Sequence, residues 1–362
     1  MRILHLCSYY FGSKVYEEIC NHFNTEKIKF DVVILSKLGD KNRKVQDVSS
    51  NKILDVQVLP KLIGTFPLLK GLYSLFFASK AINLKEYSLI HAHTLFSDGV
   101  LAWLCNKFLG IKYIVTVRNT DLNTYLKKMP WTKFLARKII ESSEKVVFIS
   151  HSYKYQAIEA FPSVFLDRSK LVVIPNGVSD QWLLNTSSNI DRKNKILFVG
   201  NATRNKNFES IIEALRKDIE FFSSYELVAV GIKKESYPHL DDSDLKITYM
   251  GKITDFNELQ SIYCEAKCMV LASYHETFGL VYLEALSCGT PILYSKGQGF
   301  DGWFPEGEVG FSVNPYDSVD ISKKLKLILN KKFNSKKLVS ESKKFSWNNT
   351  CSELEKLYLN IF

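Results

Sequence analysis

Two glutamates, Glu276 and Glu284, stand eight positions apart in the stretch HETFGLVYLEALSCG. The apolar run CMVLAS before them is typical of a buried strand. The run between them has the composition of a helix that ends at Gly289, because glycine often follows the last helical residue. We expect this helix to begin near Thr277 or Phe278. The first carboxylate would then lie in the loop before the helix and the second within the helix.

The start of this helix suits an anion. The first amides of a helix lack intrahelical partners and carry partial positive charge. Gly279 has no side chain, so a bulky anion can approach the backbone there. The sequence therefore predicts a phosphate site between the two carboxylates. The alternative is an exposed helix start with an unrelated pair of glutamates.

A second strand, loop and helix follow the same plan in KILFVGNATRNKNFESIIEAL. The loop from Gly200 to Asn207 contains Arg204 and Lys206. Cations beside the N-terminus of a helix suit a diphosphate. Basic loops are common, but the two loops together favour a nucleotide-diphosphate sugar as the ligand.

Short apolar runs alternate with longer helical patterns along all 362 residues. This alternation predicts an α/β protein with parallel sheets covered on both faces by helices. Two such series are separated by a polar stretch, residues 176–194, which we interpret as a linker. We therefore expect two doubly wound, Rossmann-like domains that face a central cleft, with ligands at the carboxyl ends of the strands.

Charge and cysteine content narrow the classes of protein. Residues 1–180 contain 25 Lys and Arg against 15 Asp and Glu, so they carry the whole net charge of +10. This uneven distribution suggests an anionic partner for the first half, with a solvated basic surface as the alternative. The seven cysteines form no CxxC motif, which predicts reduced, mostly buried thiols in a cytosolic protein. Lys70 and Lys80 interrupt the most apolar segment, residues 62–82, so we expect no membrane span.

The segment YLKKMPWTKFLARKII combines aromatic and basic residues. Pro130 is expected at the first helical position. Trp131 and Phe134 would lie beside the basic side of this helix, which suits an anionic membrane interface. The alternative is a helix that packs its aromatic side chains on its own domain. The cations of the segment are Lys127, Lys128, Lys133 and Arg137.

With these motifs, the sequence resembles the family 4 retaining glycosyltransferases of the GT-B fold over nearly its whole length. The strongest element is the pair of glutamates in HETFGLVYLEALSCGTP, followed by VVIPNGV, the FVG…KN loop, LIHAH and FSWNNTCSELEKLY. The resemblance implies an acceptor-binding Rossmann-like domain in residues 1–180 and a nucleotide-sugar-binding one in residues 181–345. A C-terminal helix in residues 346–362 would cross back to the first domain.

The resemblance also implies the roles of individual residues. Glu276 would lie near the reacting face of the transferred sugar, and Lys206 would neutralise the leaving diphosphate with help from Arg204. Glu284 would accept hydrogen bonds from the nucleotide ribose. The other donor-binding residues would be Gly200, Asn201, Phe278, Gly279 and Leu280, where Asn201 replaces an arginine that is frequent in the family.

On the acceptor side, the resemblance implies a cleft lined by Gly12, His93, Arg118 and Asp121. Gly12 belongs to the N-terminal loop that closes over the site, although family members often have two glycines there. Arg118 stands in TVRNTD where many members have a histidine that contacts the transferred sugar. A hydrogen-bonded structural role is the alternative for His93.

Two short motifs point to other chemistry. GQGFDG, residues 297–302, matches a dinucleotide-binding pattern, but no helix pattern follows it, so we favour a loop beside the donor site over NAD binding. DDSD, residues 241–244, contains a possible metal-binding pair, but a solvated acidic loop is favoured. We therefore expect no metal and no cofactor.

The sequence thus favours a retaining glycosyltransferase of cell-envelope polysaccharide synthesis, cytoplasmic and peripheral on the inner face of the membrane. Its partners would be a nucleotide sugar, a saccharide or polyprenyl-diphosphate-linked acceptor and an anionic membrane surface. Alternatives are a sugar-nucleotide epimerase, a phosphorylase, a dehydrogenase, or a protein that binds nucleic acid or another anionic polymer. Nucleic acid is not favoured, since no recognition motif is present.

Overall fold

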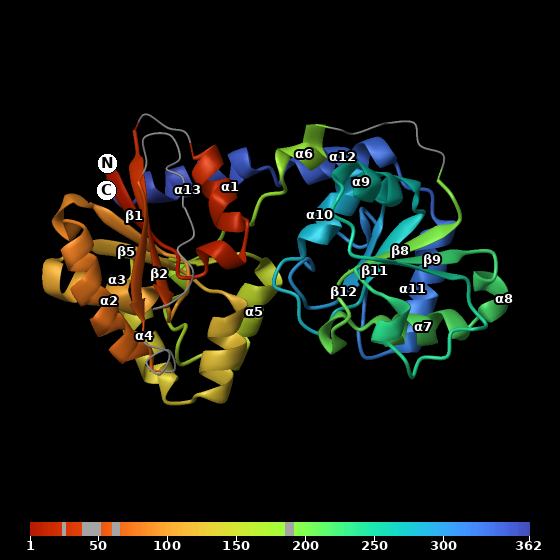
Figure 1. Ribbon diagram of the computed structural model, residues 1–362, viewed down its shortest axis with the longest axis horizontal. Coiled ribbons are helices and arrows are strands. Elements are labelled where there is room, and N and C mark those ends of the chain that lie inside the picture. Colours follow the sequence, from red (N-terminus) through yellow and green to blue (C-terminus); the bar gives the residue numbers. More distant parts are fainter. Residues whose placement is uncertain (24–26, 38–51, 60–65, 185–191) are drawn as a thin grey trace. The chain divides into compact units, whose positions relative to one another are not determined.

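The computed structural model describes residues 1–23, 27–37, 52–59, 66–184 and 192–362. The chain divides into two compact units, residues 1–175 with 347–362 and residues 176–346. Each unit is built around one parallel sheet with helices packed on it (Figure 1). The prediction of two doubly wound α/β domains is confirmed. Part of the expected linker, residues 185–191, lies outside the described residues.

The first unit contains a seven-stranded sheet in the order β3-β2-β1-β4-β5-β6-β7. The order reverses between β1 and β4, so the loops after these two strands diverge. The strands are β1 (Arg2–Leu6), β2 (Lys29–Lys37), β3 (Ile53–Leu59), β4 (Leu89–Ala92), β5 (Lys112–Thr116), β6 (Lys145–Phe148) and β7 (Leu171–Val173).

Two layers of helices cover this sheet, as Figure 1 shows. Side chains of α2 to α5 join one core cluster, and those of α1 and α13 join the cluster on the opposite face. The helices are α1 (Val15–His22), α2 (Pro67–Ala81), α3 (Gly99–Leu109), α4 (Thr132–Ser142), α5 (His151–Ala160) and α13 (Trp347–Leu359). No helix in the described part of the chain is long and apolar enough to cross a membrane.

The second unit contains a six-stranded sheet in the order β10-β9-β8-β11-β12-β13. The order reverses between β8 and β11. Its strands are β8 (Lys195–Val199), β9 (Glu226–Val230), β10 (Ile247–Gly251), β11 (Cys268–Leu271), β12 (Ile292–Ser295) and β13 (Gly310–Val313). Its helices are α6 (Asp180–Leu184), α7 (Phe208–Arg216), α8 (Ile219–Phe222), α9 (Phe256–Glu265), α10 (Leu280–Ser287), α11 (Ser318–Asn330) and α12 (Ser335–Lys343).

Two strands were missed by sequence analysis, and both lie at sheet edges. β3 has the sequence ILDVQVL and β13 the sequence GFSV. Each pairs with only one neighbour, β2 or β12. Strands buried on both faces show continuous apolar runs, whereas these two mix polar and small residues into theirs. All seven cysteines are free and buried, as predicted.

One arginine, Arg192, bonds to the C-terminal ends of two helices of the second unit. The guanidinium of Arg192 donates hydrogen bonds to the carbonyls of Cys264, Ala266, Cys288 and Gly289, at 2.5 to 3.1 Å. It also reaches the hydroxyl of Thr290 at 2.7 Å. These acceptors lie in the last turn of α9 or just after α9 and α10. A single side chain thus satisfies carbonyls that the two helices leave unpaired at their C-termini.

Replacing Arg192 by methionine should destabilise the second unit by about 3 kcal/mol or more, because several partly buried carbonyls would lose their donor. Urea unfolding followed by circular dichroism measures this change. The matched control is Lys193→Met, which removes only the exposed ion pair with Glu265 and should cost less than about 1 kcal/mol. Equal effects of the two substitutions would show that Arg192 is not a structural clamp.

Candidate active site

The predicted donor loops meet where the strand order of the second sheet reverses. β8 and β11 are neighbours, and the loops after them are residues 200–207 and 272–279. Gly200 continues the ladder beyond β8, because its amide donates to the carbonyl of Val230 at 3.0 Å. Crevices at such reversal points are where doubly wound folds bind ligands.

Lys206 and Glu276, from the two loops, form an ion pair. Lys206 Nζ lies 2.8 Å from Glu276 Oε2, and the side chains are 23% and 14% exposed. The pair is therefore partly shielded from water, but a small ligand can still contact it. It presents a cation that can meet a phosphate and a carboxylate that can meet sugar hydroxyls.

The backbone of Glu276 is held by the loop after β12. Its amide donates to the side-chain oxygen of Gln298 at 3.0 Å, and its carbonyl accepts from the amide of Gly299 at 2.7 Å. A Cβ on Gly299 would lie 2.2 Å from the carbonyl carbon of Thr277, so only glycine fits. This is the GQGFDG segment. The dinucleotide-binding pattern requires a helix after the glycines. Residues 296–309 form turns and bends instead.

The helix after Glu276 starts later than predicted. α10 begins at Leu280, and Gly279 is its N-cap with a φ of 85°. That left-handed conformation favours glycine, and a Cβ there would lie 2.4 Å from the ring of Tyr282. The sequence placed the start two or three residues too early, because the turn around Gly279 has no local pattern. Phe278 is buried against Trp303 and Phe345 and anchors this turn.

Glu284 lies one turn into α10 and is partly buried. Its Oε2 accepts a hydrogen bond of 2.8 Å from the hydroxyl of Tyr263 on α9. Burial raises the pKa of Glu284, and the bond from Tyr263 opposes this rise. The hydroxyl of Tyr263 thus orients this carboxylate through Oε2.

Asn205 and Asn207, which sequence analysis did not single out, join the two loops. The Asn205 side chain donates to the carbonyl of His275 and accepts from its amide, at 2.9 and 3.0 Å. Asn207, with a φ of 56°, donates to the carbonyls of Ala272 and Pro315. Asparagine tolerates this left-handed conformation better than most residues. The asparagine of the FVG…KN motif could therefore have indicated, from the sequence, that the backbone turns at this position.

The other predicted donor residues of this loop are exposed. Asn201 and Arg204 both lie at the surface, and no ion pair of Arg204 occurs among the described residues. Asn201 accepts a hydrogen bond from Thr203 at 3.0 Å. The structure thus brings Lys206, Glu276, Gly279 and Leu280 into one neighbourhood and leaves Arg204 at its rim.

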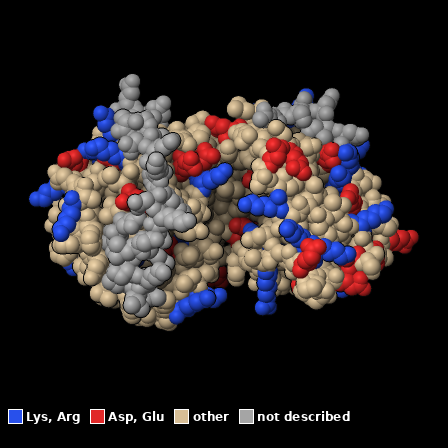
Figure 2. Space-filling view, viewed as in Figure 1, with Lys and Arg blue, Asp and Glu red and all other residues tan. Residues whose placement is uncertain are grey.

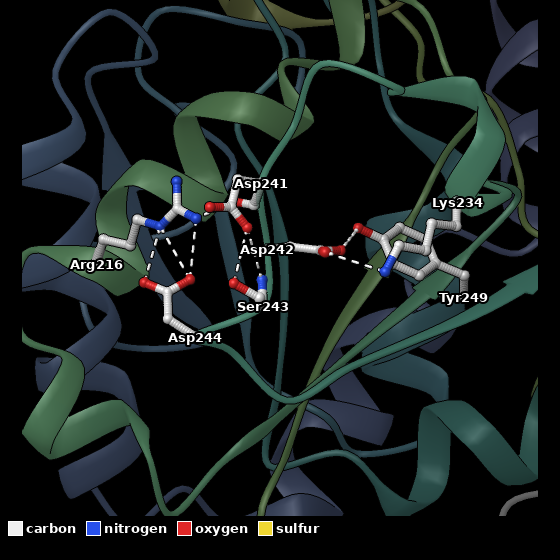
Figure 3. A network of polar contacts seen from close by, with 7 residues as sticks. All are labelled: Arg216, Lys234, Asp241, Asp242, Ser243, Asp244 and Tyr249. Carbon is white, nitrogen blue, oxygen red and sulfur yellow. Dashed lines mark hydrogen bonds and ion pairs between the residues drawn. The ribbon is translucent and has the colours of Figure 1, made fainter.

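The acidic segment DDSD forms its own contacts (Figure 3). Asp244 pairs with Arg216 at 2.9 Å, and Asp241 accepts from the amide and hydroxyl of Ser243. Asp242 is buried, accepts a hydrogen bond from the Tyr249 hydroxyl and lies 3.3 Å from Lys234 Nζ. Each carboxylate of the segment therefore has a hydrogen-bond or ion-pair partner within the second unit.

In the first unit, Asp121 organises the loops after β4 and β5. Its buried carboxylate accepts hydrogen bonds from the amides of Leu95, Phe96 and Arg118, at 2.8 to 3.3 Å. Burial raises the pKa of Asp121 to about 6, against the effect of these amides. Arg118, next to it, lies over the ring of Tyr16 at 5.7 Å. Asp121 therefore holds the backbone of Arg118 in place.

His93 is buried in a cluster with His5 and His91. His5 Nδ1 lies 3.0 Å from His93 Nε2, and the rings of His91 and His93 stack at 4.0 Å. Both nitrogens of His91 lie within hydrogen-bond distance of the hydroxyls of Tyr358 and Thr116. Burial lowers the pKa of His5 to about 3 and lowers those of the other two as well. The cluster is thus a neutral, mostly hydrogen-bonded part of the core.

The loop that contains Gly12 follows β1 beside this cluster. Gly12 closes a short 3-10 turn, η1 (Tyr10–Gly12), and a Cβ on it would lie 2.2 Å from the ring of Tyr9. The hydroxyl and amide of Ser8 both donate to Asp98, which fixes the start of the loop.

Two family models match the chain: Glycosyltransferase Family 4 over residues 12–182, and Glycosyl transferases group 1 over residues 180–345. The chain belongs to glycosyltransferase family 4. An uncharacterised glycosyltransferase of Methanocaldococcus jannaschii is 26% identical over 286 residues, which cover 76% of each protein. This glycosyltransferase therefore matches its family through both units.

Two further relatives of this glycosyltransferase are informative. A Campylobacter jejuni protein named as an alpha-1,4-N-acetyl-D-galactosaminyltransferase that acts on a diNAcBac-PP-undecaprenol glycan is 25% identical over 244 residues, 65% of this chain and 64% of that protein. The solved structure of the lipopolysaccharide outer core galactosyltransferase WaaB superposes with a TM-score of 0.76 at 15% identity over the whole of both chains. The second likeness shows the shared GT-B fold.

If the orienting bond from Tyr263 leaves Glu284 free to hold a ribose, Glu284→Ala should weaken binding of the nucleoside diphosphate by about 1.5–3 kcal/mol, because a charged hydrogen bond is lost. Calorimetry measures this affinity. Tyr263→Phe is the matched control: it removes the hydroxyl but keeps the carboxylate, and should reduce affinity less. Unchanged affinity in Glu284→Ala would assign Glu284 a structural role alone.

Proposed function

We propose that this glycosyltransferase moves a sugar from a nucleotide-diphosphate sugar to a saccharide or lipid-linked saccharide acceptor, with retention of the anomeric configuration. The observation that carries the proposal is the Lys206–Glu276 pair at the reversal point of the second sheet. A cation and a carboxylate joined there suit the two ends of a sugar diphosphate. The N-terminus of α10 beside Gly279 supplies further positive potential.

In the proposed reaction, the bond between the anomeric carbon and the diphosphate oxygen breaks while the acceptor oxygen bonds to the same carbon. Lys206, Arg204 and the first amides of α10 stabilise the negative charge that develops on the leaving diphosphate. Glu276 binds the sugar and stabilises the positive charge on its ring. The proton of the acceptor hydroxyl passes to a donor phosphate oxygen on the same face, which explains retention without a protein base or a cofactor. Lys206 and Arg204 would supply the positive charge that a metal ion provides in other transferases.

The acceptor and the pathway are proposed from the relatives. The similarity to a transferase named for an undecaprenyl-diphosphate-linked glycan, and to WaaB in fold, supports a lipid-linked acceptor and a role in envelope polysaccharide synthesis. Arg118, held beside Tyr16, would meet the phosphate or an acidic sugar of such a ligand.

A membrane partner is proposed from the basic first unit and from α4. The prediction that Pro130 begins this helix is wrong, because Pro130 and Trp131 form a turn and α4 begins at Thr132. Trp131 and Phe134 are 54% and 71% exposed, so a large part of each aromatic side chain is available for an outside contact. In Figure 2, acidic and basic side chains are mixed over the visible face of the second unit. An anionic inner membrane face therefore suits the first unit.

A screen of sugar nucleotides tests the proposed function. Thermal shifts with UDP-, GDP- and other nucleotide sugars identify the donor, and mass spectrometry of products formed with saccharide and lipid-linked acceptors identifies the transfer. Nuclear magnetic resonance of the new linkage shows its anomeric configuration. Inversion would overturn the retaining mechanism, and a product formed without an acceptor would point to epimerase chemistry.

Glu276→Ala and Lys206→Ala should each slow turnover by roughly 100-fold or more, because each removes charge stabilisation from the transition state. Both residues lie in loops, so the proteins should stay folded by circular dichroism. Steady-state kinetics with the identified donor measures the effect. Lys193→Ala, which removes an exposed cation of the same unit, is the control and should turn over normally. Near-normal rates in the first two variants would contradict the assignment.

Replacing Lys127, Lys128, Lys133 and Arg137 together by glutamine should greatly weaken binding to anionic vesicles. Each cation near such a surface contributes about 1 kcal/mol, which salt screens. Vesicle sedimentation at low and high salt measures the binding. The matched control is the quadruple glutamine variant of Lys323, Lys324, Lys331 and Lys332 in the second unit, which should sediment like the wild type. Sedimentation of the α4 variant like the wild type would show that this helix makes no membrane contact.

A further inference from the structure

Helix α2 is oriented with its large apolar side chains outward. The residues it buries are Pro67, Lys70, Gly71, Ser74 and Ala78, which are small or polar. Its exposed side includes Leu69, Leu72, Tyr73 and Phe76, which are 44 to 54% exposed. This spacing of three and four residues places them on one stripe of the helix. A helix of a soluble domain normally turns such a stripe toward the core.

The inner face of α2 explains this orientation. A Cβ on Gly71 would lie 2.3 Å from Val100 on α3, so the two helices approach more closely than larger residues would permit. Lys70 is buried on the same face. Burial raises the pKa of Asp98, and the positive charge of Lys70 is among the effects that oppose this rise. Rotating α2 to bury its leucines would expose the small residues and separate this pair of charges.

The surroundings of the stripe are basic. The exposed charged residues of α2 and α3 are Lys80 and Lys107, and neither helix contains an acidic residue within its bounds. Lys80 Nζ lies 4.1 Å from the ring centre of Phe76, and Lys107 Nζ lies 5.3 Å from that of Trp103. Phe108, at the end of α3, is 65% exposed. Trp103 is partly buried, whereas Phe76 is exposed. A lysine beside an exposed aromatic ring, as Lys80 is beside Phe76, suits the boundary between lipid headgroups and acyl chains.

We propose that the outward stripe of α2 inserts into the headgroup region of an anionic membrane and supplies an apolar contact that salt does not screen. This inference rests on the proposed membrane partner and adds a second element to the contact made by α4. α2 packs on α3 and α3 packs on α4, on one face of the first sheet (Figure 1). A second copy of the chain fits this surface poorly, because a symmetric contact would bring its lysines together.

A triple variant tests the insertion: Leu69→Gln, Leu72→Gln and Phe76→Gln. These side chains are exposed and glutamine suits helices, so the protein should remain folded and bind its nucleotide normally. Its partition into vesicles of phosphatidylglycerol and phosphatidylcholine should fall at least about tenfold, given the apolar area removed. The residual binding of the wild type at high salt should disappear. Ile219→Gln, Val319→Gln and Leu327→Gln form the matched control, with exposures of 41 to 47% in the second unit.

A labelled cysteine locates the contact. All seven native cysteines are buried, so Tyr73→Cys provides an accessible thiol for a polarity-sensitive fluorophore. Its emission should shift to the blue with anionic vesicles, whereas that of a Val319→Cys control should not. An unshifted Tyr73→Cys emission in a vesicle-bound protein would overturn the inference and leave the contact of α4 intact.

The remaining outcomes separate the inference from the proposed function. Unchanged partition of the triple variant would overturn insertion by α2. Dissociation of a wild-type dimer by the triple substitution, without lipid, would show that the stripe is a protein interface and would also overturn it. Failure of the wild type to bind any vesicle would overturn both membrane contacts, whereas sugar transfer to a soluble acceptor would still support the proposed chemistry.

Discussion

The ion pair between Lys206 and Glu276 is the interaction on which the proposed chemistry depends. It joins loops that follow two strands far apart in sequence but adjacent in the sheet. A partly buried ion pair adds little to stability, because desolvation offsets the Coulomb attraction. In the proposed function the pair matters for position: each charge holds the other at the place where the sugar diphosphate would bind.

The surrounding residues fix this pair through the backbone. Asn205 joins the two loops, Gln298 and Gly299 hold the amide and carbonyl of Glu276, and Gly279 turns the chain into α10. The loops that carry the two charged side chains are thus held by hydrogen bonds in which the charged groups themselves take no part. These loops can keep their geometry when Lys206 and Glu276 bind a ligand instead of each other. Electrostatic catalysis requires such preorganised charges.

The first unit departs from the usual division between apolar interior and polar exterior in two places. Its core includes the neutral histidines His5, His91 and His93, and its surface includes the apolar stripe of α2. The histidines remain buried because their rings stack and most of their nitrogens meet neutral partners. The stripe is exposed because the packing of α2 on α3 requires small residues. The histidines would lower stability if they had to be charged in the core. The stripe of α2 is exposed apolar area, which commonly marks a contact surface.

The sequence by itself determined the class of fold and the positions of the two loops that are predicted to bind the donor. Buried parallel strands have continuous apolar runs, and the loops after them carry residues of recognisable chemistry. Lys206, Glu276 and Gly279 could therefore be proposed as site residues from the sequence. The family resemblance added the roles of these residues, and the family matches support the fold and the enzyme class. Edge strands β3 and β13 were missed because their sequences lack that apolar continuity.

Only the tertiary structure decided which distant side chains meet. Gln298 lies against Glu276, and Tyr263 against Glu284, because β12 and α9 are brought beside the donor loops by sheet order. The acidic segment DDSD forms ion pairs with Arg216 and Lys234. No local sequence pattern indicates these pairings. The outward rotation of α2 was likewise invisible in its sequence: an apolar stripe specifies one face of a helix, and the neighbouring helix decides whether that face turns inward or toward solvent.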